Sequence, residues 1–278
     1  MTQGEKRIRG NKASQASGRS PDNTSWDHVA DWYDTIAAQP GTEFHQNIVI
    51  PGTLRMLGLH FGEKVLDLAC GQGTVTRALH RAGAQATGVD LSPRLIGMAR
   101  QHSSRDIRYV VGDACCLDSL PDQSFDAIVC VLAAQNIDPI ESVFQESARL
   151  LHPMGRLVLV LNHPSFRIPR QTRWQRDEDR KLLCRVVDRY LTALKIPIDT
   201  HPFKSPGRKT TWTFHRPLQT YVNGLSEAGL WTNALEEWPS HKSSQPGPAA
   251  HAENRARAEF PLFLALRAVR VEPHSPAP

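Results

Sequence analysis

Short apolar runs alternate with longer amphipathic segments between residues 64 and 162, and this alternation constrains the fold more than any other feature of the sequence. The short runs are apolar on both faces, as parallel strands buried between two layers are. Strands of this kind separated by helical segments indicate a parallel sheet covered by helices. We therefore expect an α/β fold with strands at residues 64–69, 85–90, 107–111, 125–132 and 155–162.

Proline-containing pairs mark the starts of two helices between these strands. Ser92 and Pro93 supply an N-cap and a first helical position, and Asp138-Pro139 followed by Glu141 gives the same signal. After the strands the sequence predicts one more helix, with Gly229 near its end, and a last buried strand. The expected helices are 26–37, 43–58, 93–102, 139–151 and 216–230, and the expected last strand is 260–269.

Residues 163–215 interrupt this pattern and are interpreted as an insertion after the fifth strand. The segment is rich in proline, arginine and aromatic residues, and one helix is expected at 175–194. It contains more than twice as many Arg and Lys as Asp and Glu. Such a basic segment is a solvated face, a site for an anionic ligand or a nucleic-acid surface, and the sequence leaves the three open. Its aromatic residues form either a substrate lid or a small core of their own.

Composition bounds the class of protein. The chain has 278 residues, of which 40% are hydrophobic and 22% charged, and no apolar stretch reaches the roughly 18 residues of a membrane span. We expect one domain at residues 26–278 after a disordered basic tail at 1–25, for which a nucleic-acid arm is the weaker alternative. The five cysteines show neither CxxC nor Cys/His spacing, so we expect reduced thiols, no metal site and a cytoplasmic location.

The turn in VLDLACGQGT, residues 65–74, is built to approach a ligand. Gly71 and Gly73 precede a helical segment, TVTRALHRAG, and bring bare backbone and a helix N-terminus together. The dinucleotide fingerprint needs a third glycine where this chain has Thr76. Asp67 would repel a pyrophosphate but suits the ammonium and sulfonium groups of S-adenosylmethionine. The turn therefore favours S-adenosylmethionine and disfavours an oxidoreductase.

The same stretch, extended to VLDLACGQGTVTRAL, resembles the first motif of class I S-adenosylmethionine-dependent methyltransferases, and the resemblance covers residues 64–162. The broader pattern, including LLHPMGRLVLV, is similar to the type 11 subgroup that acts on quinones and other small molecules. The N-P-P-Y type motif of base-amine methyltransferases is absent at residues 133–136. The resemblance implies a Rossmann-like doubly wound seven-strand sheet, with an N-terminal helical cover and an insertion after strand five. It also implies S-adenosylmethionine as cofactor and S-adenosylhomocysteine as product.

The resemblance further implies the residues that hold the cofactor. Asp90 would accept from both ribose hydroxyls, and Asp113 would accept from the adenine amino group. Alternatively, Asp90 is a helix-capping acid and Asp113 a surface turn residue. Tyr33, on one face of the helix expected at 26–37, would close over the methionine end or simply pack on the sheet. The expected cofactor-binding residues are Tyr33, Asp67, Ala69, Gly71, Gly73, Asp90, Leu91, Asp113, Ala114 and Val131.

Ligands of open parallel sheets bind at the carboxyl ends of the strands, so the segment after strand five should frame the reacting group. His163 is the candidate general base, because a neutral imidazole accepts a proton near pH 7. Its alternative is a structural histidine at the strand end. Arg167 and Arg170 are candidates for clamping a carboxylate or phosphate of the substrate, or they brace loops. His45, His215 and His241 are lesser candidates for the base.

The sequence thus predicts methyl transfer from S-adenosylmethionine to a small-molecule acceptor, and an anionic acceptor is one open interpretation. An RNA or protein methyltransferase is an alternative, which the basic insertion and tail would serve. A non-catalytic S-adenosylmethionine-binding protein is another. We expect a small-molecule partner, neither nucleic acid nor membrane, and the oligomeric state stays open.

Overall fold

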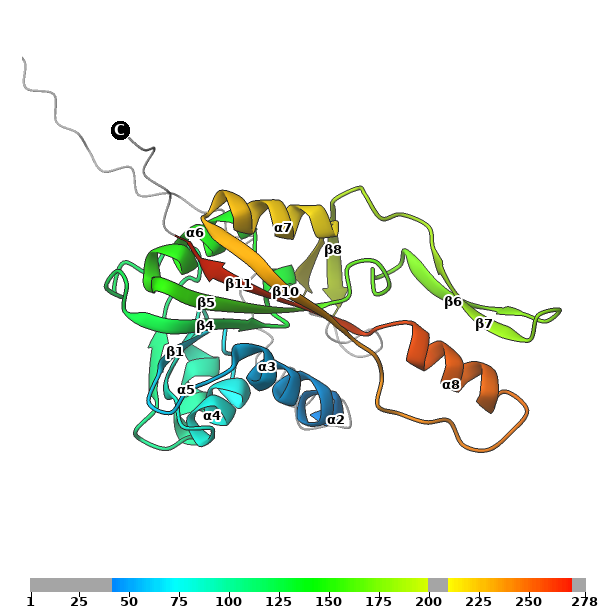
Figure 1. The fold of residues 1–278 in the computed structure, drawn as a ribbon, viewed down its shortest axis with the longest axis horizontal. Coiled ribbons are helices and arrows are strands. Elements are labelled where there is room, and N and C mark those ends of the chain that lie inside the picture. Colours follow the sequence, from blue (N-terminus) through cyan, green and yellow to red (C-terminus); the bar gives the residue numbers. More distant parts are fainter. Residues whose placement is uncertain (1–41, 200–209, 272–278) are drawn as a thin grey trace, which may run out of the picture.

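The computed structural model describes residues 42–199 and 210–271, and its centre is a seven-strand sheet (Figure 1). All five strands expected between residues 64 and 162 are present, and the expected last strand follows as β11. Along the sheet the order is β10-β11-β5-β4-β1-β2-β3. The strands are β1 Lys64–Leu68, β2 Gln85–Asp90, β3 Arg108–Val111, β4 Phe125–Val131, β5 Leu151–Asn162, β10 Leu230–Trp238 and β11 Phe263–Arg270.

Strands β1 to β5 are parallel where they pair, whereas β11 runs antiparallel between β5 and β10. The strand order reverses between β1 and β4, which is where open α/β sheets bind their ligands. The predicted Rossmann-like, doubly wound α/β class with seven strands is therefore confirmed. The antiparallel β11 makes the sheet mixed.

Helices cover both faces of the sheet (Figure 1). On β4, Ile128 and Cys130 pack into one core with α6 and α7, while Ala127 and Val129 pack into a second core with α3 and α4. Alternate side chains of a strand point to opposite faces, so both sets are buried and the strand reads as apolar throughout. The helices are α3 Ile50–Leu57, α4 Thr74–Arg81, α5 Pro93–Gln101, α6 Ile140–Leu150, α7 Leu218–Glu227 and α8 Ala250–Glu259.

The helix expected at 43–58 is continuous but not regular. It begins as α2 (Thr42–Phe44), passes through a π-helical turn (His45–Val49) and continues as α3 to Gly58, whose φ of 57° ends it. The helix expected at 26–37, with Tyr33, and the tail at 1–25 lie outside the described residues. Within the described part, no helix is long and apolar enough to cross a membrane.

The segment after β5 forms two hairpins, and the helix predicted at 175–194 is wrong. Strands β6 (Thr172–Asp177) and β7 (Leu182–Val187) pair antiparallel instead. The Arg180 N–H donates to Asp177 Oδ1 across the turn at 2.9 Å, and the β-branched residues of LLCRVV favour a strand. In Figure 1 this hairpin and α8 extend together away from the sheet.

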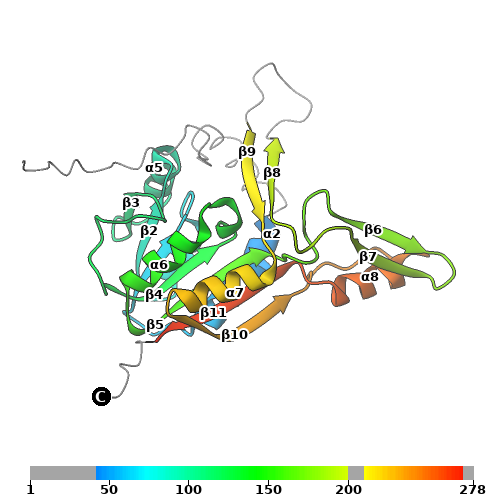
Figure 2. The same cartoon turned by 90° about the horizontal axis from the view of Figure 1, so that it is seen from above.

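The second hairpin joins β8 (Leu194–Asp199) to β9 (Thr210–His215). Figure 2 shows it rising from the body of the molecule, well apart from the tip of the first hairpin. Trp174 of β6 packs its ring edge-on against Phe260, at 5.5 Å between ring centres. Trp174, which is 44% exposed, therefore packs against the end of α8 within the β6–β7 arm.

Candidate active site

A cavity of about 360 Å³ lies at the carboxyl ends of the parallel strands, beside the point where the strand order reverses. The loops after β1, β2, β3, β4 and β5 contribute to its wall, and the β8–β9 hairpin closes one side. Its lining residues are His45, Ala69, Asp90, Leu91, Leu95, Gly112, Asp113, Ala114, Cys115, Leu132, Ala133, Gln135, Asn136, Ile137, Asp138, Asn162, Pro169, Ile198 and Thr213.

Asp90 presents a fixed carboxylate to this cavity from the end of β2. Its Oδ2 accepts from the Gly71 N–H at 2.8 Å, and its Oδ1 accepts from the Ser92 N–H at 2.9 Å. Ser92 in turn caps α5 by accepting from the Leu95 N–H at 3.1 Å. Each carboxylate oxygen can accept more than one hydrogen bond, and a carboxylate at this position is the kind of acceptor that a pair of ligand hydroxyls requires.

The turn after β1 needs left-handed backbone at three positions. The φ angles of Ala69, Gly71 and Gly73 are 54°, 56° and 80°. A Cβ at Gly73 would also lie 2.3 Å from the Tyr109 hydroxyl, so packing demands glycine there. Of the three, only Ala69 lines the cavity. Gly71 and Gly73 thus shape the turn, and the Gly71 N–H also holds the Asp90 carboxylate in place.

Asp67 lies beneath the turn and does not line the cavity. Its side chain is 2% exposed, and Thr76 Oγ1 donates to Oδ2 at 2.6 Å. Burial raises the pKa of this carboxyl to about 7; the Thr76 hydrogen bond opposes the rise and the nearby Asp90 charge adds to it. Asp67 thus bonds Thr76, the residue that stands where the dinucleotide fingerprint has its third glycine. The direct contact between Asp67 and a cationic ligand that the sequence predicted is wrong, because Asp67 does not line the cavity.

The loop after β3 brings Asp113, Ala114 and Cys115 to the cavity wall. The Cys115 N–H donates to Asp113 Oδ1 at 2.9 Å, and the Cys116 N–H donates to the Asp113 carbonyl at 2.8 Å. These bonds turn the loop tightly at Asp113, so its carboxylate stands at the mouth of the cavity next to apolar Leu91 and Cys115.

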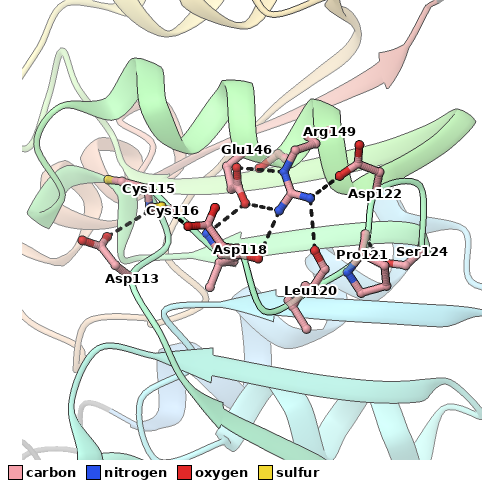
Figure 3. Close-up of polar contacts among 12 residues, drawn as sticks. Asp113, Cys115, Cys116, Asp118, Leu120, Pro121, Asp122, Ser124, Glu146 and Arg149 are labelled. Atoms are coloured by element: carbon pink, nitrogen blue, oxygen red, sulfur yellow. Dashed lines mark hydrogen bonds and ion pairs between the residues drawn. The ribbon is translucent and has the colours of Figure 1, made fainter. Parts of the chain in front are cut away.

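A charged cluster on α6 holds this loop in place (Figure 3). Glu146 Oε1 accepts from the Leu117 N–H at 2.9 Å. Arg149 donates to the carbonyls of Leu117 and Leu120, each at 3.1 Å, and pairs with both Glu146 and Asp122. Sequence reasoning missed this cluster, because neither residue belongs to a motif and their partners lie far away in the chain.

The loop after β4 supplies the opposite wall, through Leu132 and Ile137. Val131, the residue expected there, ends β4 and does not line the cavity. Leu132 has a φ of 54°, so two non-glycine residues with left-handed backbone, Ala69 and Leu132, meet at this cavity. Strained backbone of this kind is typical of ligand sites.

His163 lies directly after β5, but both of its ring nitrogens are engaged. The Ser165 N–H donates to Nδ1 at 3.1 Å, so Nε2 carries the proton and donates to Glu237 Oε1 at 2.7 Å. The ring is 4% exposed, and burial lowers its pKa. It does not line the main cavity. This arrangement favours a structural role for His163 over a role as the general base.

A smaller cavity of about 50 Å³ lies next to the main one and shares Gln135, Asn162, Pro169 and Thr213 with it. Arg167 lines this inner cavity and stacks over the Phe263 ring at 5.7 Å, whereas Arg170 lines neither cavity. The other residues that line the inner cavity are His163, Pro164, Ile168, Phe214, His215, Arg216 and Tyr221.

Of the lesser histidine candidates, His45 lines the main cavity and His215 the inner one. The His215 Nε2 bonds the Tyr190 carbonyl at 2.6 Å, and burial lowers its pKa. His241 lines neither cavity and contacts Asn47 and Phe44.

Comparisons with known proteins agree with this site. Residues 66–159 match a family described as a methyltransferase domain. Demethylmenaquinone methyltransferase of Tropheryma whipplei (strain Twist) is 41% identical over 115 residues, 40% of this chain and 46% of that protein. Ubiquinone biosynthesis O-methyltransferase of Xanthomonas oryzae pv. oryzae (strain PXO99A) is 37% identical over 101 residues, 35% of this chain and 42% of that protein. The chain thus spans less than half the length of these relatives.

A crystal structure of an S-adenosylmethionine dependent methyltransferase from Mesorhizobium loti covers more of the molecule. It matches 79% of this chain and 96% of its own, with a TM-score of 0.62 and 28% sequence identity. The sheet order, the cavity at its switch point and the family match therefore agree. They identify residues 66–159 as a class I S-adenosylmethionine-dependent methyltransferase domain.

Proposed function

We propose that this chain transfers the methyl group of S-adenosylmethionine to a small-molecule acceptor. The position of Asp90 is the observation that carries the proposal: a fixed carboxylate faces the cavity at the end of β2, as two ribose hydroxyls would require. Asp113 adds an acceptor for an adenine amino group, and Leu91 and Cys115 offer apolar surface to the ring. These residue types fit an adenosine.

The rest of the cavity is suited to the acceptor. It continues from Leu132 towards Asn162 at the end of β5, and Ile198 and Thr213 of the β8–β9 hairpin close it. We propose that this hairpin, part of the segment at 163–215, is the substrate lid. A cavity of this size suits a small molecule better than a polymer.

What the protein must supply follows from the reaction. S-adenosylmethionine brings a methyl group on a sulfonium, and the chain's own residues align the acceptor and exclude water. A base is needed only where the nucleophile keeps a tightly held proton. His163 would have to release the Ser165 N–H from Nδ1, its unprotonated ring nitrogen, before it could act as a base, whereas an acceptor that arrives ionised needs none.

The nature of the acceptor is supported by less direct observations. The relatives above are named for demethylmenaquinone and ubiquinone biosynthesis, which fits a ring-containing acceptor for this chain as well. Arg167 in the inner cavity supports an anionic one. No disulfide joins the five cysteines, all of which the structure describes, and this suits a reaction in the cytoplasm.

Calorimetric binding of S-adenosylhomocysteine tests the proposal. The chain should bind it, and Asp90→Asn should weaken binding at least tenfold, because a carboxamide accepts more weakly from hydroxyls. The exposed Asp106→Asn is the matched control and should bind as the unmodified chain does. Equal affinity in Asp90→Asn, or tighter binding of NADH than of S-adenosylhomocysteine, would contradict the proposal.

A further inference from the structure

Arg216 is a buried cation that the methyl-donor site does not explain. It follows β9, and the residue is 7% exposed. Its Nη2 donates to the Ile137 carbonyl at 2.8 Å and to Asp138 Oδ1 at 2.7 Å. Its Nη1 is also buried and makes no hydrogen bond of ordinary geometry among the described residues, although burial raises the pKa of the neighbouring Tyr221 hydroxyl and the Arg216 guanidinium opposes that rise. Buried guanidinium nitrogens without a partner are rare, because the lost hydration is not replaced.

The inner cavity gives this nitrogen a place to act. Arg216 lines it, and Gln135, Asn162, Pro169 and Thr213 line both this cavity and the main one. The Oε1 of Gln135 is likewise buried without a partner among the described residues. Arg216 Nη1 lacks an acceptor and Gln135 Oε1 lacks a donor, so an anionic oxygen would satisfy the first of these groups and a ligand hydroxyl or a water the second.

The charges around the inner cavity have one sign. Its wall contains Arg167 and Arg216, and none of its described lining residues is a carboxylate. Asp138, the ion partner of Arg216, does not line the inner cavity and has a side chain that is 55% exposed, so water screens it. The Ser165 N–H donates to Nδ1 of His163, which keeps that ring nitrogen unprotonated and the ring neutral. The inner cavity therefore favours an anion.

The size of the inner cavity limits what enters. At about 50 Å³ it accepts a group of a few heavy atoms, such as a carboxylate or a phenolate oxygen, but not a whole ring. The adjoining wall of the main cavity, with Leu132, Ile137 and Pro169, suits an apolar body. A molecule that bridges the two cavities would thus have an apolar body and a short anionic end.

We propose that the inner cavity binds an anionic oxygen of the methyl acceptor, and that Arg216 Nη1 donates the hydrogen bond that orients it. This inference rests on the proposed methyl transfer and narrows its acceptors to small acids or ionised phenols. The anionic oxygen is the group by which the acceptor is held. Arg167, at the rim of the same cavity, strengthens the field without making that contact.

Paired probes test the inference on the full chain saturated with S-adenosylhomocysteine. Calorimetry compares benzoate with neutral benzamide, and 4-nitrophenolate with neutral 4-nitroanisole, so the two arms separate a carboxylate from a phenolate. In at least one arm the anion should bind about tenfold more tightly, because a charge-assisted hydrogen bond replaces a neutral one. Arg216→Gln should abolish this preference, and Arg173→Gln, on the exposed β6–β7 arm, should retain it.

The possible results separate failure of this inference from failure of the proposed function. Equal binding of anion and neutral probe in both arms, or a preference that survives in Arg216→Gln, overturns the inference. If Arg216→Gln does not fold, a crystal structure of the unmodified chain with the preferred anion decides, since its oxygen must lie within hydrogen-bond distance of Arg216 Nη1. Failure to bind S-adenosylhomocysteine would instead overturn the proposed function. Binding of S-adenosylhomocysteine without a preference for anions overturns this inference alone.

Discussion

Replacing Asp67 by Asn should change how the stability of the protein depends on pH. The Asp67 carboxyl is fully buried beneath the glycine turn, and its pKa rises from an ordinary 3.8 to about 7. A raised acid pKa means that the unfolded chain releases its proton first, so the folded state loses stability as pH rises from about 4 to 7. The full difference corresponds to about 4 kcal/mol, of which roughly 2–3 kcal/mol falls between pH 5 and 8.

Asn keeps the acceptor for Thr76 Oγ1 and has no proton to lose. Denaturant unfolding of both proteins between pH 5 and 8 measures the effect. The free energy of unfolding of Asp67→Asn, relative to the unmodified chain, should rise by about 2–3 kcal/mol over this range. The exposed Asp106→Asn should show no such trend. Parallel profiles for Asp67→Asn and the unmodified chain would refute the reasoning, because they would mean that Asp67 titrates normally.

Three further substitutions have clear expectations. His163→Gln removes the hydrogen bond to Glu237 and should lower the free energy of unfolding by about 1–3 kcal/mol. Turnover per folded molecule should stay the same. Slower turnover at unchanged stability would instead support His163 as the general base. Ala69→Gly relieves left-handed backbone and should raise the unfolding free energy by about 1 kcal/mol, and a lower melting temperature would contradict this. Arg149→Met should cost about 2–4 kcal/mol and weaken S-adenosylhomocysteine binding, since the loop carrying Asp113 loses its support; unchanged calorimetry and melting would contradict it.

The sheet could be predicted because its physical requirement is local. A parallel strand covered on both faces must be apolar at successive positions, as β4 is, and such runs are visible in the sequence. The positions of Asp90 and Asp113 then follow, because Asp90 ends one predicted strand, Asp113 lies two residues after another, and the carboxyl ends of parallel strands meet at one edge. β10 was missed since it is the edge strand, where exposed and half-buried residues alternate between the buried ends Leu230 and Trp238.

The rest of the site depends on contacts between distant residues. Arg216 and Asp138 are separated by 78 positions, and Arg149 and Leu120 by 29, so no motif joins them. Within the insertion at 163–215 the prediction of one helix at 175–194 is wrong, because the pairing of β6 with β7 depends on contacts across a turn and overrides local helix propensity. The sequence also did not show whether the Asp67 side chain faces the cavity or is buried beneath the turn, because the same glycine turn allows either position.

Transfer of isotopically labelled methyl from S-adenosylmethionine into an extract of the source cells tests the central claim most directly. The extract is separated into metabolites, nucleic acid and protein after incubation with the full chain, and Asp90→Asn serves as the matched control. Label should appear in an acidic or phenolic metabolite and fall at least tenfold with the variant. Label confined to RNA or protein, or equal label with Asp90→Asn, would contradict the assignment of a small-molecule methyltransferase.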